Sequence, residues 1–96
     1  MPTYVTLSHF TDQGFKNIKD AVKRSEPFKK AAKEAGVTVK ELLWTQGQYD
    51  VVSILEGPEE AIAALGLSIV KMGNVTGQTL RGFTAAEMEK ILAKVA

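Results

Sequence analysis

Few side chains in this sequence could take part in a reaction, and the most suggestive pair is His9 and Asp50. His9 lies near the end of an expected first strand, and Asp50 lies at the start of an expected third strand. If these two strands pair antiparallel, both side chains come close on the face of the sheet that carries the helices. A carboxylate can orient an imidazole for proton transfer, so His9 and Asp50 are the candidate catalytic residues.

Asp50 also has a purely structural interpretation. Its carboxylate could accept hydrogen bonds from backbone N–H groups at the start of the helix expected after Thr11. We favour this helix-capping role, because a single His–Asp pair without a nucleophile is a weak signal for catalysis. Both roles remain open on the sequence alone.

A second candidate site combines aromatic, hydroxyl and basic side chains on the sheet face expected to point away from the helices. Its residues are Tyr4, Trp44, Tyr49, Ser53 and Arg81. Tyrosine, tryptophan and arginine are favoured at protein interfaces, so this face is interpreted first as the contact between two copies of the chain. The small hydroxyl residues Ser53, Thr6 and Ser8 could still leave room for a small-molecule ligand between two sheets.

Composition disfavours several other function classes. Twelve Lys and Arg against eleven Asp and Glu leave a net charge of +1, so no overall field attracts nucleic acid. Arg81-Gly82-Phe83 matches an RNA-binding sheet motif only in part. Cysteine is absent, and His9 with Asp50 or Glu41 falls short of the ligand set of a transition-metal site. We therefore expect no metal, no other cofactor and no nucleic-acid partner.

Basic residues gather on one face of the first expected helical segment. They are Lys16, Lys19, Lys23, Arg24, Lys29, Lys30 and Lys33. This face could bind anions, but a solvated helix face explains the pattern without any ligand.

The N-terminus and the hydropathy pattern bear on the compartment. The chain starts directly with Pro2-Thr3-Tyr4, without a basic segment followed by an apolar stretch, and no apolar run approaches the ~20 residues that span a bilayer. The lack of cysteine fits a reducing environment. We expect a cytoplasmic protein with no membrane partner.

The elements that position these residues begin with a strand over Tyr4–Phe10, in which Val5, Leu7 and His9 are expected to face the helices. Thr11 then predicts a helix N-cap. A helical stripe follows and ends at Gly36, with a kink or break expected at Ser25-Glu26-Pro27 because proline cannot continue an interior turn.

The segment 41–57 predicts a β-hairpin at the centre of the sheet. Two runs of β-branched and aromatic residues flank Gln46-Gly47, which suits a two-residue turn. This turn would place Trp44 opposite Tyr49, Leu43 opposite Asp50, Leu42 opposite Val51 and Val39 opposite Ile54.

The second half of the chain predicts a helix, a strand and a terminal helix. The helix that follows the hairpin is expected to begin at Gly57-Pro58-Glu59-Glu60 and to end at Gly73. Asn74–Phe83 reads as a strand, with a bulge expected near its glycines. Thr84-Ala85-Ala86-Glu87 matches a capping box and begins the last helix.

The resulting order is strand, helix, strand, strand, helix, strand and terminal helix, within one domain over residues 1–96. This order predicts an α+β fold, a ferredoxin-like βαββαβ antiparallel sheet with helices on one face plus a C-terminal helix. The sheet face without helices would be covered by a second copy, which makes the chain a homodimer or a higher homo-oligomer.

Several blocks of sequence together resemble the GYD domain family. They are Tyr4-Val5-Thr6-Leu7, Thr11-Asp12-Gln13-Gly14, Trp44-Thr45-Gln46-Gly47, Tyr49-Asp50-Val51-Val52, Gly73-Asn74-Val75 and Thr79-Leu80-Arg81. The Gly-Tyr-Asp signature itself is interrupted, because Gln48 separates Gly47 from Tyr49. The resemblance implies a small bacterial or archaeal ferredoxin-like protein, similar to dimeric α+β barrels, and it supplies no catalytic residues.

Two functions follow as expectations. The first is a homo-oligomeric small-molecule binding or scaffold module. The alternative is a cofactor-independent barrel-type enzyme, oxygenase or isomerase-like, which would use His9 or the Tyr49-Asp50 region beside a cavity between subunits. Fold-level analogy alone supports the enzyme.

Overall fold

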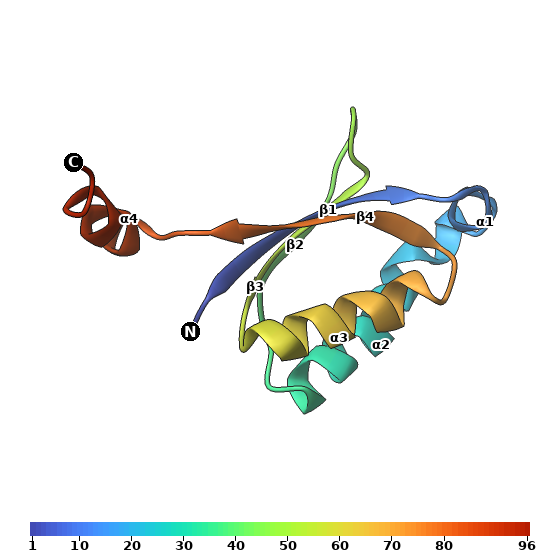
Figure 1. Ribbon diagram of the computed structural model, residues 1–96. Helices are drawn as coiled ribbons and strands as arrows, with labels where there is room; N and C mark the ends of the chain where they lie inside the picture. Colours follow the sequence, from blue (N-terminus) through green and yellow to red (C-terminus); the bar gives the residue numbers. More distant parts are fainter.

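The computed structural model describes all residues of the chain, 1–96. Its elements are β1 (Thr3–Phe10), α1 (Asp12–Lys16), the 3-10 helix η1 (Ile18–Asp20), α2 (Ala21–Glu34), β2 (Thr38–Trp44), β3 (Val51–Glu56), α3 (Glu59–Val70), β4 (Val75–Gly82) and α4 (Ala85–Leu92). The strands form one antiparallel sheet in the order β2-β3-β1-β4. Helices α2 and α3 lie along one face of this sheet (Figure 1). The predicted α+β, ferredoxin-like fold is confirmed.

The first helical segment is broken earlier than expected. Thr11 caps α1 by accepting a hydrogen bond from the N–H of Gly14 at 3.2 Å, as predicted. The break then falls at Asn17 and η1, whereas Pro27 lies inside α2, so the predicted interruption at Pro27 is wrong. Proline removes one intrahelical hydrogen bond, but α2 also buries Ala32 and packs Phe28 against the core. Tertiary packing therefore holds α2 together across the proline.

The central hairpin has a longer connection than the predicted two-residue turn. Trp44 pairs with Val51 instead of Tyr49, and Leu43 pairs with Val52 instead of Asp50. Residues 45–50 form the loop, which is closed by a hydrogen bond of 2.8 Å from the Thr45 N–H to the Asp50 carbonyl. The observed pairing is shifted by two positions from the predicted one. An even shift leaves each residue on the same sheet face as its predicted neighbours.

The bulge lies in β2 and not in β4. The β2–β3 register shifts between Val39 and Glu41, so Val39 pairs with Leu55 instead of Ile54 and turns towards the helices. In contrast, β4 pairs with β1 without interruption. Gly77 has a different role there, because a Cβ at this position would lie 2.1 Å from the Leu7 carbonyl oxygen. It allows the two backbones to approach closely.

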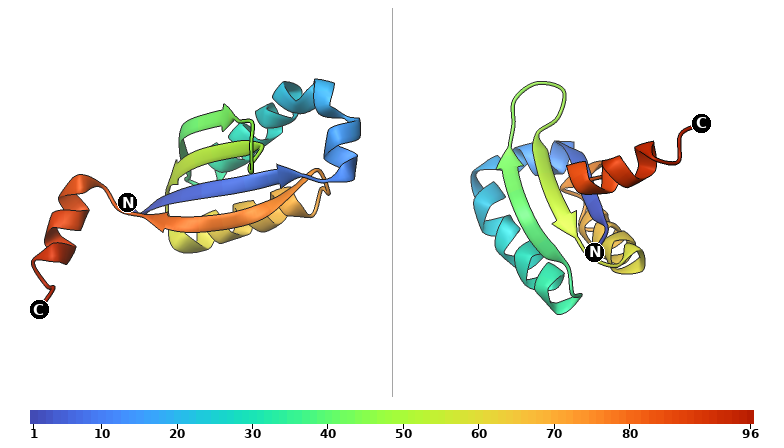
Figure 2. Two further views of the ribbon diagram at one scale, coloured as in Figure 1. Left: turned by 90° about the horizontal axis from the view of Figure 1, so that it is seen from above. Right: turned by 90° about the vertical axis from the view of Figure 1, so that its left-hand side faces the viewer.

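The two faces of the sheet are assigned to the wrong sides in the sequence-based prediction. The buried core consists of Ala32, Val37, Leu55, Ile62 and Leu65, with Tyr4 packed against it. Tyr4 and Leu55 therefore face the helices, and strand alternation puts Val5, Leu7 and His9 on the face without helices. Seen from above, the strands lie in front of the helices, with no element covering them (Figure 2). Both faces carry apolar and aromatic residues, so hydrophobicity alone did not distinguish them.

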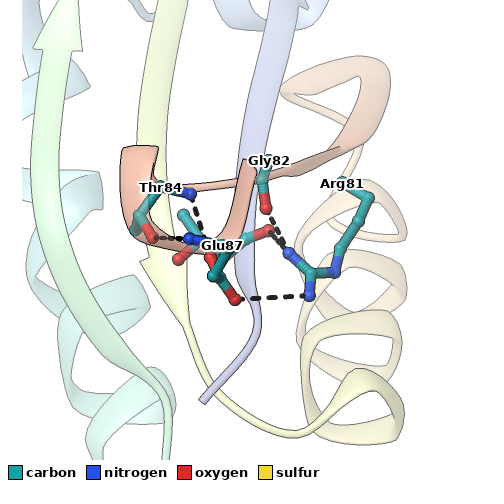
Figure 3. A network of polar contacts seen from close by, with 5 residues as sticks. Arg81, Gly82, Thr84 and Glu87 are labelled. Atoms are coloured by element: carbon teal, nitrogen blue, oxygen red, sulfur yellow. Dashed lines mark hydrogen bonds and ion pairs between the residues drawn. The ribbon is translucent and has the colours of Figure 1, made fainter. Parts of the chain in front are cut away.

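Helix α4 stands apart from the rest of the molecule, beyond the end of β4 (Figure 1). The predicted capping box is confirmed: Thr84 Oγ1 accepts from the N–H of Glu87 at 3.2 Å, and Glu87 Oε1 accepts from the N–H of Thr84 at 2.9 Å. Arg81 Nη2 lies 3.8 Å from Glu87 Oε2 (Figure 3). No residue of α4 is buried, and none of the helices is both long and apolar enough to cross a bilayer.

Candidate functional site

A cavity of about 730 Å³ lies between the sheet and helices α2 and α3. Hydrophobic residues make up 16 of its 28 lining residues. Core residues Leu55, Ile62 and Leu65 line it, and strand pairing places Phe10 and Val75 at the opposite end of the sheet. The compact core thus fills only one end of the space between sheet and helices, and the cavity extends along the rest.

Small side chains create this cavity. On the sheet side, β1 contributes Thr6 and Ser8, β3 contributes Ser53, and β4 contributes Gly77. On the helix side, α3 contributes Gly66, where an added Cβ would meet no atom within 4 Å. Interiors normally reach crystal-like density because large side chains interdigitate. These residues are too small to fill the layer between α3 and the sheet.

The sheet wall of the cavity is polar at its centre. Ser53 is only 3% exposed, and its hydroxyl is hydrogen-bonded to the hydroxyl of Thr6. Ser8 lines the cavity two positions along β1. The sequence predicted that these three hydroxyl residues leave room for a ligand. The structure places that room between the sheet and its own helices instead of between two subunits.

Three of the five residues of the second candidate site line one cavity, and Arg81 lies 5.7 Å from the ring centroid of one of them, Tyr4. Tyr4, Trp44 and Ser53 line the cavity, and Trp44 on the edge strand β2 remains 42% exposed. Tyr49 lies in the loop 45–50, where its hydroxyl accepts a hydrogen bond of 3.0 Å from the side chain of Gln78. Arg81 lies over the ring of Phe83, 4.5 Å from its centroid, and pairs with Glu87. The cavity is therefore lined by three of the five predicted site residues, Tyr4, Trp44 and Ser53.

His9 and Asp50 serve separate contacts. The imidazole stacks against the ring of Tyr49, with centroids 4.8 Å apart, on the sheet face away from the cavity. The Asp50 carboxylate accepts a hydrogen bond from the Phe10 N–H at 2.9 Å, and the Asp50 N–H donates to the Ser8 carbonyl at 2.8 Å. No hydrogen bond joins His9 to Asp50.

The prediction that Asp50 caps the first helix is therefore wrong. Its carboxylate accepts from the Phe10 N–H, which precedes α1, and not from an N–H group of the helix. Thr11 caps α1 itself, and Asp50 extends the contact between β1 and the start of β3. The cause is the longer hairpin loop, which begins β3 one residue later and leaves the carboxylate level with the end of β1. The role of Asp50 is still structural, since it satisfies a backbone donor. The structure contains no group of three or more His, Asp or Glu side chains placed to hold a metal ion.

Arg24 lines the cavity and was missed as a site residue. Sequence reasoning placed it on the basic helix face and favoured a solvated role there, because a pattern of charges alone is weak evidence for a ligand. Since α2 is continuous, Arg24 shares a stripe with Phe28 four residues later, and this spacing would have identified it. The guanidinium donates to the backbone carbonyls of Asn17 and Gly14.

The sequence was also compared with known proteins. The family model described as GYD domain matches residues 4–92, a span that runs from β1 to the end of α4 and includes every element around the cavity. A search of curated proteins gave no match. The predicted resemblance is confirmed, and the chain belongs to the GYD domain family.

Proposed function

We propose that this protein is a small-molecule binding module whose ligand occupies the cavity between the sheet and helices α2 and α3. The observation that carries the proposal is the cavity itself, about 730 Å³ with a mainly apolar lining and a few polar groups. Ligand sites of proteins are typically concave, about 300–1,000 Å³, and combine these two features.

Energetics support a binding role over a simple packing defect. The cavity is partly open to solvent, and small residues from three strands and from α3 maintain it. Its apolar lining is therefore in contact with water. A ligand that covers this lining would remove apolar surface from water, which makes its binding favourable.

The lining also indicates the character of the ligand. Tyr4 and Trp44 offer aromatic surfaces, and Leu42 and Ile69 offer aliphatic ones. Ser8 supplies a hydroxyl that makes no hydrogen bond with another side chain. We therefore expect a ligand with a largely apolar body and a small number of polar groups.

The alternative of a cofactor-independent enzyme that uses His9 has no comparable support. His9 lies on the opposite face of the sheet from the cavity, and its ring is stacked on Tyr49. Acid–base catalysis needs the group within hydrogen-bond reach of the substrate, directly or through one water.

A neutral apolar fluorophore, N-phenyl-1-naphthylamine, tests the binding proposal. It should bind the wild-type chain, with energy transfer from Trp44, the single tryptophan. Gly66→Leu should weaken this binding about ten-fold or more, because the new side chain enters the cavity. Gly66→Ala is the matched control, since it makes the same helix position more favourable but fills little space.

The two variants also separate binding from stability. Both should raise the free energy of unfolding in urea by about 0.5–1 kcal/mol, because glycine is unfavourable inside a helix. Equal affinity of the fluorophore for all three proteins, or no binding to any of them, would show that the cavity is not a ligand site.

We also propose that a second copy of the chain covers the helix-free face of the sheet. This open face carries a cluster of apolar residues, and Glu41, Gln78 and His9 lie on the same face. The apolar residues are Val5, Leu7, Leu43, Val52, Ile54 and Leu80. Leu43 is 52% exposed and Leu80 is 43% exposed in the isolated chain. Monomeric proteins rarely expose large contiguous apolar patches, and a second copy presents the same patch for a symmetric contact.

A further inference from the structure

Arg24 is one of two charged residues that line the cavity, and the other is Glu59. The two lie at opposite ends. Arg24 lies 5.9 Å from the ring centroid of Phe10, at the end of β1, whereas Glu59 follows β3, whose last residue Glu56 pairs with Thr3 at the start of β1. With a rise of about 3.3 Å per strand residue, these ends are separated by roughly 20 Å. Arg24 therefore sets the charge of its end of the cavity without an opposing carboxylate from Glu59.

The guanidinium of Arg24 has no carboxylate partner within the chain. The three ion pairs of the structure are Lys29–Glu26, Lys40–Glu56 and Arg81–Glu87. Arg24 instead donates one hydrogen bond from Nη1 to the Asn17 carbonyl and a longer one, 3.5 Å, from Nη2 to the Gly14 carbonyl. A guanidinium has five N–H donors, so these contacts leave donors and the full positive charge available.

The same contacts fix the orientation of the side chain. Asn17 lies at the break between α1 and η1, where its carbonyl accepts from the Arg24 guanidinium and, at 3.0 Å, from the Asp20 N–H. Phe10 provides a ring beside the guanidinium. A guanidinium that is already held in place loses less side-chain entropy when it binds an anion.

We propose that Arg24 binds the carboxylate of an apolar organic acid whose body occupies the cavity. The inference rests on the proposed function and names its ligand class. The planar guanidinium can hold a carboxylate through parallel N–H···O bonds, and these charge-assisted bonds are stronger than those to a neutral group. The acidic Glu59 at the far end disfavours a ligand with a second carboxylate there, so the expected class is the monocarboxylic acids.

Calorimetric titration with decanoate and decanamide tests this assignment. The two probes share the same apolar chain and differ in head-group charge at neutral pH. The wild-type chain should bind decanoate about ten-fold more tightly than decanamide, because the charge-assisted contact adds to the common apolar term. Arg24→Gln should remove this preference and leave the affinity for decanamide unchanged.

Two further variants control for charge and for stability. Lys23→Gln removes the adjacent positive charge on the exposed face of α2 and should leave both affinities unchanged. Arg24→Lys keeps the charge without the planar fork, so it should retain part of the preference for decanoate. This variant also tests the inference if Arg24→Gln fails to fold.

The outcomes separate the inference from the function on which it rests. If decanoate and decanamide bind the wild-type chain equally, and Arg24→Gln changes neither affinity, the carboxylate assignment is wrong while the binding function stands. If Arg24→Gln weakens both probes equally and lowers the unfolding temperature, Arg24 only supports the α1–η1 break. If neither probe binds the wild-type chain at millimolar concentration, both the inference and the proposed function fail.

Discussion

Several residues have roles that differ from those their type suggests. On the sequence alone Asp50 is a candidate catalytic carboxylate, yet it accepts a hydrogen bond from the backbone of Phe10. Trp44 was considered as the anchor of a dimer contact, yet it lines the cavity. Arg24 belongs to the predicted basic, solvated helix face, yet it lines the cavity and its guanidinium lies beside the ring of Phe10. In each case the element around the residue decides what the side chain meets.

The role of Asp50 leads to a stability prediction. Asp50→Ala should lower the free energy of unfolding by about 1–2 kcal/mol, because the partly buried Phe10 N–H loses its acceptor. Asp50→Asn should cost less, since the amide oxygen can still accept this bond. Urea unfolding measures both values.

Asp12→Ala is a suitable control for the charge change, because Asp12 is exposed in the first turn of α1. It should change the free energy of unfolding by less than about 1 kcal/mol. Losses of equal size for Asp50→Ala and Asp12→Ala would contradict the assigned contact.

The helices and strands agree with the sequence where local signals specify them. Thr11 and Thr84 cap their helices as predicted, and Gly36 and Gly73 adopt positive φ after α2 and α3 as expected of helix ends. The position of the hairpin loop and the location of the bulge were wrong. Both depend on how two strands pair, and Gln46-Gly47 alone does not determine that pairing.

The capping box of α4 predicts a pH dependence. The hydrogen bond from the Thr84 backbone N–H, followed by the Thr84 side chain and the charge of Arg81, lowers the pKa of Glu87 below its ordinary value of 4.5. The contribution of this carboxylate to α4 is therefore fully present above pH 4.5, and it is lost as the pH falls through the lowered pKa. The amide resonance of Thr84 should report this transition in an NMR pH titration.

Glu87→Gln is the matched control for this titration. Glutamine can keep the capping hydrogen bond but does not titrate, so the Thr84 resonance should lose its acidic transition. An unchanged transition in Glu87→Gln would assign it to another carboxylate and refute the prediction.

At the scale of the whole molecule, the sheet separates two unlike surfaces. One face and helices α2 and α3 line the partly open cavity, and the other face is uncovered and carries an apolar cluster. The projecting α4 adds to the uncovered apolar surface, with Leu92 56% exposed, and contributes to the long dimension of the 50 × 31 × 18 Å molecule. An isolated helix of this length is marginal in water, so contact with a second copy would also stabilise α4.

The dimer proposal is tested by placing a charge at the centre of the open face. Val52→Lys should convert the dimer to a monomer in sedimentation velocity, because a buried lysine without a partner is strongly unfavourable at an interface. Ala64→Lys, at an exposed position of α3 that does not line the cavity, is the control and should leave the sedimentation coefficient unchanged. A wild-type chain that stays monomeric at all concentrations would refute this interface.

The sequence by itself determined the order of the elements, their capped ends, the fold class and the division of β1 and β3 into two faces. These features depend on residues close together in the chain, such as Thr84 with Glu87, and on alternation within one strand. Only the tertiary structure decided which sheet face the helices cover, because Tyr4 and Val5 carry comparable apolar surface on opposite sides. The cavity also depends on which face the helices cover. Ser53 and Gly66 are distant in sequence, and the space between their small side chains forms only when α3 packs across the sheet.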